Sequence, residues 1–204
     1  RTIVSTDSEK IANIAKKYGA EVPFMRPSEI SRDDSTDLEL FQHAVNWFKR
    51  EESAVSDLMI QLRPTTPLRI PAEIDRAIDY LEKRPSATSL RSVHELAEPP
   101  QKMLRINQEG FLEGFFPDDP RPEYYDLPRQ MFPKAYHPNG YVDIIKPDFV
   151  QKTGSLHGPN ILGFVTQVVT EVDRPEDFEC LEYQLEKHEN PIYEYLLKNF
   201  PPED

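Results

Sequence analysis

The chain has 204 residues, enough to bury one hydrophobic core with a small appended lobe. Its formal net charge of −12 argues against general binding to nucleic acid or anionic membranes, since both require a basic face. The single cysteine, Cys180, excludes an intrachain disulfide, and its amphipathic surroundings predict a small buried hydrophobe. Because no apolar run reaches the about 18 residues of a membrane span, a reducing cytoplasm is the expected location.

The first half of the chain alternates short apolar runs with amphipathic helical patterns. Arg1 to Ser5 has the pattern of a strand in progress without an initiator methionine, so we expect further sequence upstream. Short connections between strands and helices favour a mostly parallel α/β sheet with helices on both faces. Extended segments are expected at 2–5, 21–24, 57–62 and 87–93, and helices at 8–18, 37–50 and 71–84.

The pattern changes from about residue 95, and most of the 20 prolines lie after residue 63. We expect a β-rich extension over about 95–140, within a single domain spanning 1–204. Its apolar and aromatic residues could cover a ligand or form a dimer surface. The elements expected here are a hairpin formed by 103–106 and 110–116, strands at 141–145 and 161–168, and helices from 175 and over 191–200.

The stretch from Asp57 to Arg69 organises the predicted site. Its first half is a short apolar strand, and two prolines then turn the chain into a stiff loop that carries Arg63 and Arg69. In an open α/β sheet, ligands bind outside the carboxyl ends of the strands, so this loop is a candidate anion site. A surface loop whose arginines pair with nearby acids fits the same residues.

Further polar residues fall in other predicted loops. Cations and amide donors spread over several loops of one sheet suit a ligand that bears carboxylate and phosphate groups. Taken singly, each residue also fits a solvated charge or a turn. The candidates are Arg26, Ser35, Lys102, Arg129, Gln130 and Asn139.

The residues Glu171 and Asp173 follow the last predicted strand with one residue between them. Carboxylates at this spacing can share a face and hold Mg²⁺, which prefers oxygen ligands. A solvated acidic cluster at a helix start is the alternative. The five histidines lack zinc-ligand spacing, so we expect no zinc site.

These motifs, taken in order, resemble the acylneuraminate cytidylyltransferases, also called CMP-sialic acid synthetases. The resemblance spans residues 2 to about 185 and covers several short blocks at matching spacing. The blocks are Ile3-Val4-Ser5-Thr6-Asp7, Val22 to Pro27 with Asp34-Ser35, Arg63 to Arg69, Pro100-Gln101-Lys102, Arg129-Gln130, Asn139-Gly140 and Glu171-Val172-Asp173.

The resemblance implies a Rossmann-like, three-layer nucleotidyltransferase that joins CTP to a sugar acid, uses Mg²⁺ and works as a homodimer. It also implies that the extension completes the neighbouring subunit's sugar pocket, so that the basic side chains converge on one site. The implied roles are nucleotide binding by Arg26, Ser35 and Arg63; sugar binding by Lys102, Arg129, Gln130 and Asn139; catalysis by Arg63, Lys102 and Arg129; and metal binding by Glu171 and Asp173.

The chain also departs from the family's pattern. The glycine-rich phosphate loop that precedes these motifs in the family is absent from this sequence. Arg63 stands where a glutamine is usual, and His137 and Asp143 also differ, which leaves the sugar open among sialic, legionaminic and pseudaminic types. Glu171 stands where the first metal aspartate is usual, and this longer carboxylate can still bind Mg²⁺ with a shifted geometry. Two other functions stay open, namely transfer to another sugar or sugar phosphate, and non-catalytic binding by a protein without the phosphate loop.

Overall fold

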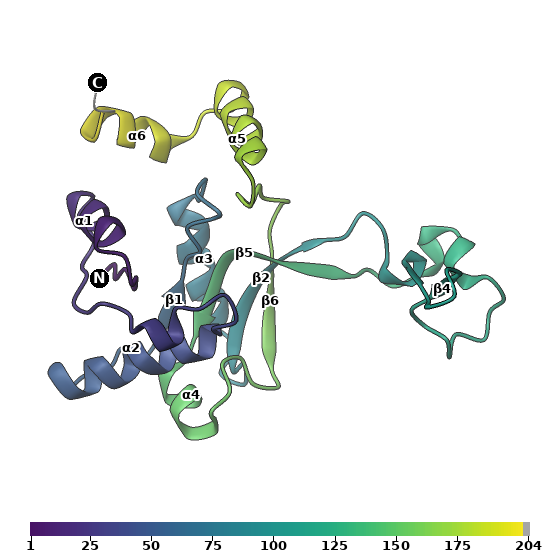
Figure 1. Ribbon diagram of the computed structural model, residues 1–204, viewed down its shortest axis with the longest axis horizontal. Helices are drawn as coiled ribbons and strands as arrows, with labels where there is room; N and C mark the ends of the chain where they lie inside the picture. Colours follow the sequence, from purple (N-terminus) through teal and green to yellow (C-terminus); the bar gives the residue numbers. More distant parts are fainter. Residues whose placement is uncertain (202–204) are drawn as a thin grey trace.

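The computed structural model describes residues 1–201 of the chain. It consists of a body built on a central sheet and an extension that projects from the body (Figure 1). The helices are α1 Glu9–Lys17, α2 Asp37–Glu51, α3 Pro71–Glu82, α4 Pro147–Thr153, α5 Pro175–Lys187 and α6 Pro191–Asn199. The strands are β1 Met59–Gln61, β2 Ser89–Glu95, β3 Leu104–Ile106, β4 Leu112–Gly114, β5 Tyr136–Ile145 and β6 Ile161–Val165.

The central sheet has four strands in the order β1-β5-β2-β6. Strands β2 and β6 pair in parallel, whereas β5 runs antiparallel to both β1 and β2. Strands β1, β2 and β6 therefore share one direction, with β5 reversed between β1 and β2. The predicted α/β class is confirmed, and the reversed strand is a feature that the strand–helix alternation did not indicate.

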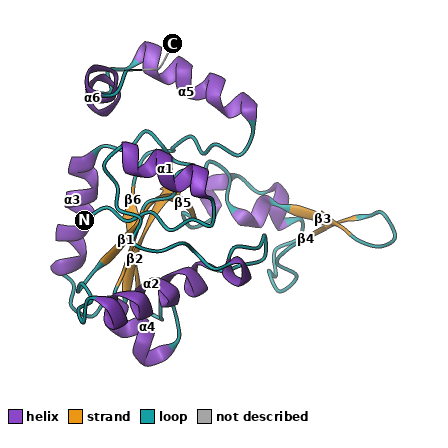
Figure 2. Cartoon of the chain, turned by 60° about the vertical axis from the view of Figure 1, so that its left-hand side comes forward, coloured by secondary structure: helices purple, strands orange, loops and turns teal. Residues whose placement is uncertain are grey.

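Helices cover the two faces of this sheet. On one face, α3 packs its Leu81 against Leu90 of β2 in the larger buried cluster. On the other face, Phe41 of α2 and Val150 of α4 pack against Ile145 of β5. Figure 2 shows α2 and α4 on one side of the strands and α3 on another. The sheet is thus a layer between helices, as predicted.

The predicted helices begin at recognisable caps or at a proline. The Ser8 side chain caps α1, and Thr36 forms a capping box with Glu39 at the start of α2. Pro71 occupies the first position of α3, where its missing N–H costs nothing. The short helix α4 was not predicted, although Pro147 marks its start in the same way.

Two expectations change in the structure. The strands expected at 2–5 and 21–24 reduce to a single parallel bridge between Ile3 and Glu21. Cys180, expected to be buried, is exposed on α5, because Leu181 takes the inward position of that helix. The apolar side of α1 is also largely exposed, with Ile11 at 51%.

The extension is the part of the chain between β2 and β5. It contains the antiparallel pair β3–β4 and three 3₁₀ turns: η2 Pro100–Lys102, η3 Tyr124–Asp126 and η4 Arg129–Met131. Buried Tyr124 ties the hairpin to η3, since its hydroxyl accepts a hydrogen bond from the Phe116 N–H at 2.7 Å. Phe111 and Leu112 on the hairpin are 67% and 65% exposed. Figures 1 and 2 both show this lobe standing away from the sheet.

Over residues 1–201, none of the helices is long and apolar enough to cross a membrane.

Candidate active site

The loop after β1 is fixed by Arg69. Its guanidinium donates to the carbonyl oxygens of Tyr141 at 2.6 Å, Arg63 at 2.8 Å and Gly140 at 2.9 Å, and also to the Thr66 carbonyl. Burial lowers the pKa of Arg69 from its ordinary value. Arg69, grouped with Arg63 as a ligand-binding cation by the sequence analysis, thus binds backbone and joins the loop to β5. Of the two arginines in the predicted anion site, Arg63 is the one that can still bind a ligand.

Gly140 is the point where three segments meet. It has a left-handed φ of +62°, and a Cβ built there would lie 2.9 Å from Arg63 Cδ and 3.0 Å from Glu171 Oε1. The Val172 N–H donates to the Thr65 carbonyl at 2.8 Å, which holds the acidic segment against the loop. The structure therefore brings Arg63 and Glu171 together at the end of β1, where the sequence predicted a site.

Arg63 also connects this point to α2. Its guanidinium forms an ion pair with Asp37 at the first turn of that helix, and Gln61 Nε2 donates to the same carboxylate at 3.0 Å. Both Arg63 and Asp37 are about one third exposed (36% and 34%), so the pair borders solvent. Ser35, a predicted nucleotide ligand, lies two residues before Asp37, and its hydroxyl accepts from the Arg32 N–H at 2.9 Å.

The two predicted metal ligands lie on one segment. Glu171 is partly buried and Asp173 is exposed. Within residues 1–201, neither carboxylate forms an ion pair or a side-chain hydrogen bond, and no group of three or more His, Cys, Asp or Glu side chains gathers to hold a metal. Mg²⁺ is commonly bound by one or two carboxylates together with substrate phosphates, so these two oxygen donors fit that ion but do not form a complete cage.

Asn139 and Arg26 have partners within the fold. The Asn139 side chain is 2% exposed; it donates to Thr166 Oγ1 at 2.7 Å and accepts from the Tyr141 N–H at 3.3 Å. These contacts fasten the turn before Gly140. Arg26 lies in the N-terminal segment, within 3.9 Å of the Asp7 carboxylate. Their predicted roles in sugar and nucleotide binding stay predictions.

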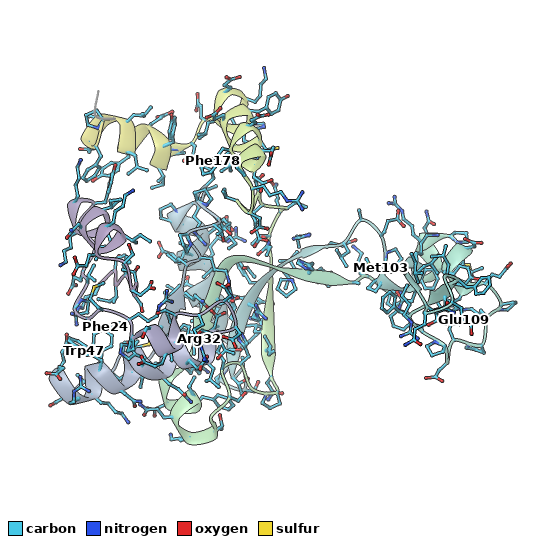
Figure 3. All side chains as sticks on the ribbon, in the orientation of Figure 1. Phe24, Arg32, Trp47, Met103, Glu109 and Phe178 are labelled. Atoms are coloured by element: carbon cyan, nitrogen blue, oxygen red, sulfur yellow. The ribbon has the colours of Figure 1, made fainter. Side chains whose placement is uncertain are left out.

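The remaining predicted residues belong to the extension. Lys102 Nζ donates to the Leu127 carbonyl at 3.0 Å, and Arg129 Nη1 to the Ala97 carbonyl at 3.5 Å. Arg129 and Gln130 line a cavity of about 500 Å³ at the base of the extension, together with Lys134. Figure 3 places the neighbouring Met103 on the projecting lobe. Within one chain the predicted residues therefore form two groups, one on the body and one on the extension.

Residues missed by the sequence analysis complete the body group. Asp37 was assigned only to a helix start, and Arg91 only to a strand. Arg91 of β2 lies against the 3% exposed Asp143 of β5, with its Nε and Nη2 each 3.4 Å from a carboxylate oxygen. A basic and an acidic residue within two predicted strands are a signal for such a pair, but the strand register that joins them cannot be read from the sequence.

His157, between α4 and β6, faces these charges. Its partial burial lowers the pKa of the imidazole, and the Arg91 guanidinium lowers it further, while Asp143 and Asp37 act in the opposite direction. The pKa of His157 therefore lies below the ordinary 6.5 of an imidazole.

Comparison with known proteins decides the family. The family model described as "Cytidylyltransferase" matches residues 1–113, more than half of the chain. The chain belongs to the cytidylyltransferase family. It is 28% identical over 191 residues to the Post-translational flagellin modification protein B of Campylobacter coli, covering 91% of this chain and 77% of that protein.

Two further matches extend across the chain. The CMP-N,N'-diacetyllegionaminic acid synthase of Campylobacter jejuni is 27% identical over 207 residues, covering 99% of this cytidylyltransferase and 80% of the relative. The solved structure of a CMP:2-keto-3-deoxy-manno-octonic acid synthetase complexed with CTP superposes with a TM-score of 0.57 at 15% identity, covering 91% and 80% of the two chains. That superposition confirms the nucleotidyltransferase fold.

We predict that Gly140→Ala is much more damaging than Gly154→Ala. Both glycines have a left-handed φ, +62° and +67°, so both variants bear a similar backbone cost of about 1 kcal/mol. An added Cβ meets Arg63 and Glu171 at Gly140 but has nothing within 4 Å at Gly154. Urea unfolding should show an additional loss of about 1–3 kcal/mol in Gly140→Ala. Equal losses would contradict the crowded junction.

We also predict a pH effect from His157. Its pKa is lower in the folded chain than the ordinary 6.5, so the unfolded chain binds more protons in that interval. The stability that the neutral His157 contributes to the folded chain is fully present above about pH 6.5. It is lost as the pH falls toward the lower pKa that His157 has in the folded chain. In urea unfolding from pH 7.5 to 5, His157→Gln should show a weaker fall in stability than wild type, with exposed His188→Gln as control. Equal slopes in the two variants would refute this role of His157.

Proposed function

We propose that the full-length protein transfers CMP from CTP to a nonulosonic, sialic acid-like sugar acid and releases pyrophosphate. The observation that carries this proposal is the meeting of Arg63 and Glu171 beside Gly140, at the carboxyl end of β1, in a member of the cytidylyltransferase family. The name of the Campylobacter jejuni relative, an N,N'-diacetyllegionaminic acid synthase, supports an acidic sugar as the acceptor.

The reaction requires alignment and charge compensation more than covalent chemistry. A hydroxyl oxygen of the sugar acid attacks the α-phosphorus of CTP, the bond from that phosphorus to the oxygen of the departing pyrophosphate breaks, and the hydroxyl proton passes to solvent. Arg63 borders solvent at this point, where its guanidinium would donate hydrogen bonds to the phosphate oxygens as negative charge develops on them. Asp37 holds the Arg63 guanidinium in position, so less order has to be gained when substrate binds.

Glu171 and Asp173 are the residues that would hold Mg²⁺. The ion would supply charge neutralisation for the phosphate oxygens. Both side chains lack a competing basic partner within residues 1–201, which leaves their oxygens available. The hydrogen bond from Val172 to Thr65 keeps the acidic segment next to the Arg63 loop.

The extension group supports a homodimer. Lys102, Arg129 and Gln130 suit the carboxylate and hydroxyl groups of a sugar acid, but they lie on a lobe that projects from the sheet bearing Arg63 (Figure 1). We infer that they complete the site of a second copy. The exposed apolar residues of the β3–β4 hairpin suit burial in such an assembly. A cytoplasmic location stays a prediction.

We predict that Glu171→Gln in the full-length protein lowers the rate of pyrophosphate release by about 100-fold, because one charged oxygen ligand for Mg²⁺ is lost. The measurement is coupled pyrophosphate release with CTP, Mg²⁺ and a panel of nonulosonic acids. Exposed Glu176→Gln, which makes the same charge change five residues along the chain, should retain wild-type activity.

Two outcomes would contradict the proposal. The first is that wild-type protein releases no pyrophosphate with any acid in the panel. The second is that Glu171→Gln and Glu176→Gln have equal activity over a Mg²⁺ titration, which would remove Glu171 from the metal site.

The shared site predicts complementation between two inactive variants. Arg129→Ala disables the extension group and Glu171→Gln disables the body group, so a mixed dimer retains one site with both groups intact. After co-expression and random pairing, activity should recover to about a quarter of wild type. Separately purified variants combined without subunit exchange are the control. Absence of recovery in proven mixed dimers would place both groups in one subunit's site.

A further inference from the structure

A polar row crosses the sheet beside the junction at Gly140. Gln61 of β1 lies opposite Asp143 of β5, Asp143 lies opposite Arg91 of β2, and Arg91 lies opposite Gly163 of β6. Neighbouring residues in register point to the same face of a sheet. This is the face that α2 and α4 cover with apolar side chains at the Ile145 end.

The row is continuous with the Arg63 site. Gln61 and Arg63 bind the same Asp37 carboxylate. The charges of Arg91, Asp143, Asp37 and Arg63 all act on the His157 imidazole, so the two arginines belong to one electrostatic group. The Arg91–Asp143 pair is thus a neighbour of the proposed active site.

Arg91 remains reachable from solvent. Asp143 is 3% exposed, whereas the Arg91 side chain is 27% exposed. Gly163 places no side chain beside it, and a Cβ there would meet only Val93 Cγ2, at 3.9 Å. The flanking residues of β6 on this face, Ile161 and Val165, are 47% and 59% exposed, so neither α2 nor α4 closes over the strand.

The guanidinium has one occupied edge and one free edge. Its Nε and Nη2 face the Asp143 oxygens at 3.4 Å, and within residues 1–201 Nη1 has no hydrogen-bond partner. A planar guanidinium has five N–H donors, so the edge formed by Nη1 and the second hydrogen of Nη2 can bind another acceptor. Because Asp143 already balances the charge, this edge favours a neutral oxygen over a second carboxylate.

We propose that Arg91, positioned by Asp143, is a specificity-determining residue that binds a neutral oxygen of the sugar acid, a hydroxyl or acyl carbonyl remote from the reacting centre. This inference rests on the proposed function and deepens it. A site built around a donor for one oxygen discriminates strongly against substrates that lack it, because the donor is then left unpaired.

The test uses the double variant Arg91→Gln/Asp143→Asn in the full-length protein. The double change keeps two neutral side chains that can hydrogen-bond to each other, and so avoids leaving the buried Asp143 carboxylate without a partner. Arg76→Gln, on α3 over the opposite face, is the matched control for loss of an arginine. KM and kcat are measured for CTP and for sugar acids that differ in a single hydroxyl or acylamino group.

We expect the double variant to raise KM for the preferred sugar acid about 10- to 100-fold and to reduce its preference over the analogue that lacks the recognised oxygen. KM for CTP and the melting temperature should stay near wild type, as in Arg76→Gln. If the double variant still releases pyrophosphate with unchanged KM and unchanged substrate preference, the proposed role of Arg91 is wrong, while the proposed function stands. If wild-type protein released none with any acid, the proposed function would fall and this inference with it.

Discussion

The arrangement of the site depends on the contacts of Arg69. Its guanidinium binds four backbone carbonyls, two in the loop after β1 and two in β5. These bonds fix Arg63 against Gly140, and the glycine in turn allows Glu171 to approach. Carbonyl groups at a proline-rich turn have few N–H partners, since prolines donate none, and an arginine with five donors satisfies several of them at once. Arg69 therefore holds the backbone at Arg63 in place through donors that backbone carbonyls already occupy.

The elements that the sequence predicted best are those with local signals. The capping residues Ser8 and Thr36 directly precede helices α1 and α2, and Pro71 is the first residue of α3. The β3–β4 hairpin also follows from local pattern. The reversal of β5 could not be predicted in this way, because strand direction depends on which neighbours a strand finds after the long extension.

The structure brings some of the predicted site residues together, while their roles stay predictions. The sequence indicated that Arg63 and Glu171 belong together, and the structure places both beside Gly140. The sequence did not show that backbone carbonyls occupy the Arg69 donors. An arginine in a loop has the same sequence pattern whether it binds backbone or ligand. The Arg91–Asp143 pair joins residues 52 positions apart, and only the register of β2 with β5 brings them into contact.

Net charge and local charge act at different ranges in this protein. A chain with a net charge of −12 repels anions at a distance, although salt screens that repulsion beyond about 8–10 Å. Binding of an anionic substrate then depends on arginines close to the contact. In the body, Arg63 and Arg91 each form an ion pair with a carboxylate. Each guanidinium therefore has a fixed orientation, and its charge is partly balanced by its partner. Paired in this way, they orient polar groups well but attract anions weakly, which agrees with the proposal that a metal ion and the basic residues of the extension complete the site.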